Sequence, residues 1–254
     1  GRSNSNSNSE SVRSSISVSH TGSIKPEMKF LIALACLLAV AAANPLDSYI
    51  LNGQNARLGQ FPWMAKISGC SASVLNKRTI LTAAHCVCNR APSSVEVGTV
   101  RAGRGTSYRV SNTYIYPGYP TGSGCAVVRD YDLAVLKTSS DIAFNTNVQP
   151  IALFSSSEPG AGTPIISMGF GGDHNGISNV LNYAETTLTR SGCGSAYFCS
   201  SRQPNSIYFG DSGGPMVYKS GSTYYQLGVN SGISSTTSLY ANVVRYASFI
   251  NRYT

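Results

Sequence analysis

The hydrophobic pattern of this chain indicates short strands rather than long helices. From Ile50 onward, segments rich in β-forming residues alternate with turns of Gly, Ser, Asn and Pro. The clearest of these segments are residues 78–83, 95–100, 132–136, 163–168 and 223–229. Helical spacing occurs only near the end, where one helix face would carry Val243, Tyr246, Ala247 and Ile250. The pattern predicts an all-β fold with a C-terminal helix, and the polar stretch 139–147 is the best candidate for a crossing between two halves.

Composition agrees with this prediction and excludes several classes of protein. Of the 254 residues, 42% are hydrophobic and 12% charged, which is enough apolar material for a sizeable core. The 25 Gly and 15 Tyr favour turn-rich, strand-rich structure over collagen, a coiled coil or a polytopic membrane protein. From Ile50 onward, 15 Lys and Arg face 8 Asp and Glu. Without a dense basic run, this charge indicates a solvated surface and no nucleic-acid partner.

The N-terminal region predicts processing before folding. Met28 and Lys29 precede an uninterrupted apolar run of 14 residues, 30–43, that ends in three alanines. This pattern predicts a signal peptide over residues 28–43 and a secreted, extracellular protein. A transmembrane helix is the alternative, but it needs roughly 17 to 25 residues, so we expect no membrane association. Residues 1–27 are rich in Ser and Asn, and we interpret them as translated leader, with a disordered extension as the alternative.

The cysteines are interpreted in the light of secretion, because thiols pair in an oxidising compartment. Cys36 leaves with the signal peptide, and the six that remain permit three bridges: Cys70, Cys86, Cys88, Cys125, Cys193 and Cys199. A metal cluster around residues 85–88 is the alternative. One histidine and closely spaced cysteines do not match the usual ligand spacing of zinc sites, so we expect no metal and no cofactor.

Three segments carry candidate chemistry. His85 directly follows the strand-like residues 78–81, which suits a base at the end of a rigid element, although a His beside a Cys is often structural. Ser212 lies in Gly210-Asp211-Ser212-Gly213-Gly214-Pro215, where a base could activate the hydroxyl and amide groups could stabilise an oxyanion. A glycine-rich hairpin is the plain alternative.

An acid would be needed to orient the base. Asp132 begins an apolar strand-like run, so we expect it in the interior beside His85, and we interpret the neighbouring Asp130 as a solvated turn residue.

Together these motifs resemble the chymotrypsin-like, trypsin-fold serine protease family. Thr82-Ala83-Ala84-His85-Cys86, Asp132-Leu133-Ala134-Val135-Leu136 and the Ser212 motif occur in that family's order of His, Asp and Ser. Ile50-Leu51-Asn52-Gly53, Gly59-Gln60-Phe61-Pro62-Trp63 and Asn147-Val148-Gln149-Pro150-Ile151 resemble its flanking segments, and Gly169-Phe170-Gly171 stands where Gly-Trp-Gly is usual. The resemblance covers essentially all of residues 50–254. It implies two six-stranded antiparallel β-barrels, here 50–140 and 141–254, the second with the C-terminal helix.

The resemblance implies a serine endopeptidase that acts on protein or peptide substrates through an acyl-enzyme. Ser212 would be the nucleophile, His85 the base and Asp132 its orienting acid, with the N–H groups of Gly210 and Ser212 as the oxyanion hole. We expect activity to fall in acid as His85 takes up a proton.

The resemblance also implies a zymogen. Cleavage of a short propeptide, residues 44–49, would create an ammonium at Ile50 that pairs with Asp211, unless Asp211 is merely a turn residue. Tyr49 stands where many relatives have Arg or Lys, so the activating protease need not be trypsin-like and could be the enzyme itself.

Substrate specificity follows from the family's pocket positions. The floor falls on Ser206 and the walls on Ile233 and Ser238, and all three are uncharged. A buried Lys or Arg from a substrate would find no partner there, so we predict non-basic, chymotrypsin-like or elastase-like cleavage. Tyr208 replaces a cysteine common in this pocket, and Ser231-Gly232-Ile233 replaces Ser-Trp-Gly, so the pocket departs from the family pattern.

Disulfide pairing and alternative functions complete these expectations. The resemblance pairs Cys70 with Cys86 and Cys193 with Cys199, which leaves Cys88 and Cys125 to bridge the loops that flank the cleft. We expect a monomer. The main alternative is a non-catalytic homologue that binds partners through the same fold; a secreted inhibitor or toxin would need a binding loop, and we identify none.

Overall fold

The computed structural model describes residues 50, 52–125, 130–172, 179–189 and 193–254. The predicted leader, signal peptide and propeptide, including Tyr49, lie outside the described residues. Within them strands predominate, and the helical elements are the 3-10 turns η1 (Ala84–Cys86) and η2 (Gly122–Gly124) and helix α2 (Ala247–Asn251). The prediction of an all-β fold is confirmed. No helix among the described residues is long and apolar enough to cross a membrane.

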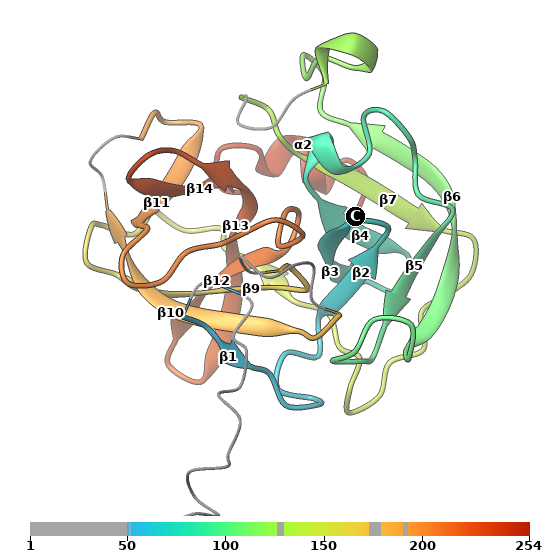
Figure 1. Ribbon diagram of the computed structural model, residues 1–254. Coiled ribbons are helices and arrows are strands. Elements are labelled where there is room, and N and C mark those ends of the chain that lie inside the picture. The colour runs from blue at the N-terminus through green and yellow to red at the C-terminus, as the bar shows by residue number, and fades with distance from the viewer. Residues whose placement is uncertain (1–49, 51, 126–129, 173–178, 190–192) are drawn as a thin grey trace, which may run out of the picture. The chain divides into compact units, whose positions relative to one another are not determined.

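The first group of strands closes into an antiparallel barrel (Figure 1). Its strands are β2 (Met64–Ile67), β3 (Cys70–Asn76), β4 (Thr79–Thr82), β5 (Ser94–Val97), β6 (Thr106–Ile115) and β7 (Ala134–Thr138). They pair in the order β2-β3-β4-β7-β6-β5, and β5 returns to β2. Small and branched side chains fill the interior, among them Ala72, Val74, Ile80, Val95 and Leu136.

The second group forms a larger sheet. Its strands are β1 (Gln54–Asn55), β8 (Ala152–Leu153), β9 (Pro164–Gly169), β10 (Asn182–Thr189), β11 (Tyr197–Ser201), β12 (Pro215–Ser220), β13 (Thr223–Ile233) and β14 (Thr237–Asn242). Because β9 pairs with both β10 and β12, six strands form an antiparallel ring, β9-β10-β11-β14-β13-β12. Strands β1 and β8 attach to it at β10 and β13.

The two strand groups share a buried hydrophobic cluster. Leu81 and Val135 of the first group belong to the same cluster as Val229 and Ala241 of the second. The C-terminal segment seals this cluster with Val243, Tyr246 and Ile250, all at most 3% exposed. The helix begins at Ala247, later than the apolar spacing predicted, because residues 243–246 form turns, from which Val243 and Tyr246 still face the core. Strands from both groups thus end beside one another, and these ends carry the site.

Candidate active site

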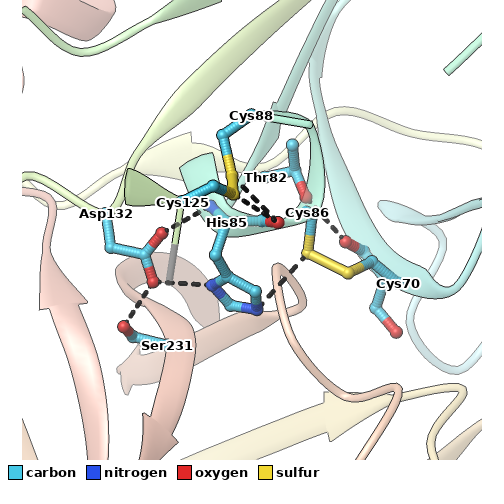
Figure 2. Close-up of polar contacts among 9 residues, drawn as sticks. Cys70, Thr82, His85, Cys86, Cys88, Cys125, Asp132 and Ser231 are labelled. Atoms are coloured by element: carbon cyan, nitrogen blue, oxygen red, sulfur yellow. Dashed lines mark hydrogen bonds and ion pairs between the residues drawn. A yellow bond between two sulfur atoms is a disulfide. The ribbon is translucent and has the colours of Figure 1, made fainter. Parts of the chain in front are cut away.

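His85 and Asp132 come from the ends of two paired strands. His85 lies in η1 just after β4, and Asp132 lies two residues before β7, which pairs with β4 so that Thr82 faces Ala134. The Nδ1 atom of His85 lies 2.8 Å from Oδ2 of Asp132, and the backbone N–H of His85 donates to Oδ1 at 2.9 Å (Figure 2). The Asp132 side chain is fully buried and that of His85 is 8% exposed. One buried carboxylate therefore holds His85 twice, the ring through Oδ2 and the backbone through Oδ1.

A hydroxyl from the other strand group completes the environment of Asp132. Ser231, in β13, donates a hydrogen bond of 2.5 Å to Oδ2 of Asp132, as Figure 2 shows. Burying an ionised carboxylate is costly unless donors surround it, and Asp132 has three. Asp130, by contrast, is exposed. Sequence reasoning assigned Ser231 to the substrate pocket and did not foresee this bond to Asp132.

The loop that carries Ser212 leaves two backbone donors free. The N–H groups of Asp211, Gly213 and Gly214 bond to Tyr208, Asn230 and Asp211, whereas no hydrogen bond among the described residues uses the N–H of Gly210 or Ser212. The carbonyl of Phe209 accepts a bond of 2.7 Å from Gly172 N–H. In a trans peptide, the C=O of one residue and the N–H of the next point in opposite directions. The bond from Gly172 to the Phe209 carbonyl therefore makes the Gly210 N–H point away from Gly172. Within the described residues, the amides of Gly210 and Ser212, two positions apart, are therefore without an acceptor.

Backbone contacts bring the Ser212 loop against the segment that bears His85. A Cβ atom at Gly213 would overlap Oγ1 of Thr82 and the carbonyl of Ser71, and Gly213 has φ +80°, so only glycine fits this close approach. Ser212 also lines the same cavity as Ser231, the partner of Asp132. Among the described residues no hydrogen bond joins His85 to Ser212; Nε2 of His85 lies 3.7 Å from Sγ of Cys86. Catalytic contacts of this kind are often long before substrate binds.

Ser71 connects the Ser212 loop to two other segments. Its buried hydroxyl donates to the carbonyl of Gly210 and accepts from the N–H of Phe170, both at 2.9 Å. Its backbone N–H donates to the carbonyl of Ser212 at 2.8 Å. Sequence reasoning did not single out Ser71, because its partners lie 139 and 99 residues away along the chain.

The side chain of Asp211, which precedes Ser212, is completely enclosed by the protein. Its fully buried carboxylate accepts hydrogen bonds from the N–H groups of Gly171 at 2.9 Å and Tyr208 at 2.8 Å. Burial raises the pKa of Asp211 to about 7, although these bonds and the positive charge of Lys66 lower it in part. A Cβ atom at Gly169 or Gly171 would overlap Asp211. The side chain of Ile50 is also completely buried.

The predicted pocket residues divide into two sets. A cavity of about 160 Å³ beside Ser212 is lined by residues 207–209, Ser212 and residues 231–233, so Ser231 and Ile233 face it. Ser206 and Ser238 are 3% and 0% exposed and do not line it. Their hydroxyl oxygens lie 3.2 Å apart.

The six described cysteines form three disulfides, Cys70–Cys86, Cys88–Cys125 and Cys193–Cys199. Two of these bridges surround the histidine. Sγ of Cys88 and Sγ of Cys125 lie 3.4 and 3.9 Å from the carbonyl oxygen of His85 (Figure 2). Cys70 and Cys86 are bonded to each other, so they offer no thiolates for a metal ion beside His85.

Comparison with known proteins gives consistent matches. The trypsin family model matches residues 50–250. Trypsin delta of Drosophila erecta is 28% identical over 223 residues, which cover 75% of this chain and 85% of the relative. Hypodermin-A of Hypoderma lineatum is 30% identical over 222 residues, which cover 75% and 84%. A mutant of human heparin binding protein has a similar fold, with a TM-score of 0.70 and 21% identity over 80% of this chain and 96% of that one.

Proposed function

The chain belongs to the trypsin family, and from this premise we propose that it is a secreted serine endopeptidase with non-basic specificity. The observation that carries the proposal is the buried Asp132–His85 pair beside a serine loop with two amide donors that no acceptor in the described part of the chain uses. Both parts are needed for acyl transfer, since a serine hydroxyl needs a base and the intermediate needs oxyanion donors.

In the proposed mechanism, Ser212 Oγ attacks the carbonyl carbon of a peptide bond while Nε2 of His85 takes the hydroxyl proton. Asp132 keeps Nδ1 protonated and stabilises the imidazolium, without itself accepting the proton. The N–H groups of Gly210 and Ser212 bind the oxyanion. His85 then gives its proton to the leaving amine, and water hydrolyses the acyl-enzyme by the same steps in reverse order.

Activation is proposed to follow cleavage between Tyr49 and Ile50. The new ammonium at Ile50 would neutralise Asp211, whose carboxylate otherwise has, within the described residues, two N–H donors and the partly desolvated Lys66 as a positive charge. The buried Ile50 side chain supports an inward position of this terminus. Pairing with the ammonium would compensate the buried negative charge of Asp211 and so fix the loop that bears Gly210.

The uncharged cavity supports cleavage after apolar residues. Its lining is mostly hydrocarbon from Ile207, Tyr208, Phe209 and Ile233, and it contains no acidic group. A substrate Lys or Arg would lose its hydration there without gaining an ion pair. A volume of about 160 Å³ suits a side chain of moderate size.

The test is labelling of Ser212 by a fluorophosphonate in protein cleaved before Ile50, with Ser212→Ala as control. We expect labelling and peptide hydrolysis by the cleaved protein, much weaker labelling of the uncleaved chain, and none in the variant. If the cleaved, folded protein neither labels nor hydrolyses any member of a mixed peptide library, the endopeptidase proposal is wrong and the non-catalytic alternative is favoured.

A further inference from the structure

A cationic side chain lies directly behind the pocket. Nε of Arg202 donates to Oγ of Ser206 at 3.3 Å, and Nη1 donates to the carbonyl of Ser234 at 3.2 Å. The backbone N–H of Arg202 also bonds to Thr236 at 3.1 Å. Arg202 is thus held at three points, two of them through its guanidinium, beside the serine that corresponds to the pocket floor.

The charge of Arg202 is not neutralised by the side chains around it. Within the described parts of the chain, ion pairs join Arg78 to Asp141 and His85 to Asp132, and none involves Arg202. The nearby hydroxyls of Ser206 and Ser238 carry no charge. Because arginine stays protonated under all ordinary conditions, the floor of the pocket has a permanently positive neighbour.

The hydrogen bonds of Ser206 strengthen this effect. Its hydroxyl donates to the carbonyl of Ile207 at 2.9 Å, and its oxygen accepts from Arg202. Oγ of Ser238 lies 3.2 Å away and can donate to the same oxygen, so both lone pairs of Ser206 Oγ are engaged and neither is left for a substrate cation. Ser206 is 3% exposed and does not line the cavity, so the cavity presents apolar surface, and the half-buried Arg202 is bonded to the serine next to Ile207, which does line it.

We propose that Arg202 is a specificity-determining residue, which sets the sign of charge that the pocket accepts. The inference rests on the proposed endopeptidase function and extends it. Arg202 disfavours Lys and Arg before the scissile bond more strongly than a neutral floor would, and it makes an acidic residue the better tolerated of the two charged classes. Uncharged aliphatic residues remain the preferred substrates, because the cavity walls are apolar.

This arrangement has a specific consequence for a change of specificity. A carboxylate introduced by Ser206→Asp would lie within reach of Nε of Arg202 and pair with it, as guanidinium and carboxylate groups do. It would then be unavailable to a substrate cation. We therefore expect that Ser206→Asp alone does not give cleavage after Lys, whereas Ser206→Asp combined with Arg202→Gln does.

The experiment compares cleaved wild-type protein, Arg202→Gln, Ser206→Asp and the double variant on peptides that differ only in having Leu, Glu or Lys before the scissile bond. Arg252→Gln, which removes an exposed positive charge, is the matched control. We expect Arg202→Gln to raise kcat/KM for Lys relative to Leu by about tenfold and to lower that for Glu relative to Leu. For the Lys peptide, kcat/KM of the double variant should be about 100-fold higher than that of Ser206→Asp. This exceeds the effect of about tenfold expected from Arg202→Gln alone, so the two changes are not independent.

Two further measurements make the outcome decisive. Fluorophosphonate labelling of Ser212 gives the active fraction of each variant, so a loss of folding is separated from a change of specificity. Binding of n-butylguanidinium, followed by NMR, tests the pocket charge without turnover and should be detectable in the double variant alone. Absence of label in every protein would contradict the proposed function. Equal binding of n-butylguanidinium, or equal cleavage after Lys, by Ser206→Asp and the double variant would overturn the role of Arg202.

Discussion

The hydroxyl of Ser71 is one of the contacts that hold the Ser212 loop, and it joins the carbonyl of Gly210 to the N–H of Phe170. Ser71→Ala would leave the carbonyl of Gly210 and the N–H of Phe170 without this partner, at a cost of about 1–3 kcal/mol for each group that stays buried. Because the loop would then sample other orientations, we expect kcat of the cleaved enzyme to fall roughly 10- to 100-fold with KM little changed.

Ser73 offers a matched control for Ser71 on the same strand. It is equally buried, but its hydroxyl bonds to Oε1 of Gln226 at 2.7 Å instead of to the loop. Ser73→Ala should lower the midpoint of urea unfolding about as much as Ser71→Ala while kcat is retained. Equal kcat losses in the two variants would show that Ser71 acts only on stability.

Single residues differ in how much of their role the sequence discloses. His85 and Ser212 lie in contiguous motifs, and Asp132 could be chosen over Asp130 because it begins an apolar run whose interior position the structure bears out. Ser71 and Arg202 lie in no such motif. The contacts of Ser71 join segments distant in sequence, and the role proposed for Arg202 depends on a charge that no ion pair among the described residues neutralises; neither property leaves a local pattern.

At the scale of elements, strands with runs of large apolar residues were predictable, whereas strands that are exposed or built from small and polar residues were not. The predicted segments 78–83, 163–168 and 223–229 overlap β4, β9 and β13. Strand β6 was missed because all of its residues are exposed or half-buried, and the alternation that begins with Tyr108 and Val110 is interrupted by a register shift between Val110 and Asn112. Strand β3 was missed for the opposite reason, since its first five residues are all buried. Both segments are extended because they pair with neighbouring strands, and local composition alone does not reveal that pairing.

The bridge between Cys88 and Cys125 should be the more important of two comparable disulfides. It closes a separation of 37 residues, against 6 for Cys193–Cys199, so loop entropy predicts losses of about 4 and about 2 kcal/mol when each pair is replaced by serine. It also contacts the carbonyl of His85. Urea unfolding and kcat/KM of Cys88→Ser/Cys125→Ser should both be affected. A larger loss of activity in Cys193→Ser/Cys199→Ser would contradict this assignment.

At the scale of the whole molecule, one buried carboxylate links pH, cleavage and stability. In the uncleaved chain, burial raises the pKa of Asp211 from 3.8 to about 7. Between pH 4 and pH 7, the folded chain therefore holds a proton that the unfolded chain has released. Raising the pH across this range draws the equilibrium toward the unfolded state, so the uncleaved protein should lose a few kcal/mol of stability and then level off above pH 7.

Cleavage before Ile50 should abolish this loss, because an ammonium beside Asp211 favours the ionised carboxylate and brings its pKa back down. The check is the free energy of unfolding by urea at pH 4, 5.5 and 7 for cleaved and uncleaved protein, each with and without Asp211→Asn, and with the exposed Asp141→Asn as control. The difference between wild type and Asp211→Asn isolates this one group from the other acids. It should decrease with pH in the uncleaved chain and not in the cleaved one. If the difference has the same pH dependence in both forms, the new terminus does not reach Asp211, and the proposed activation is wrong even if Ser212 proves to be catalytic.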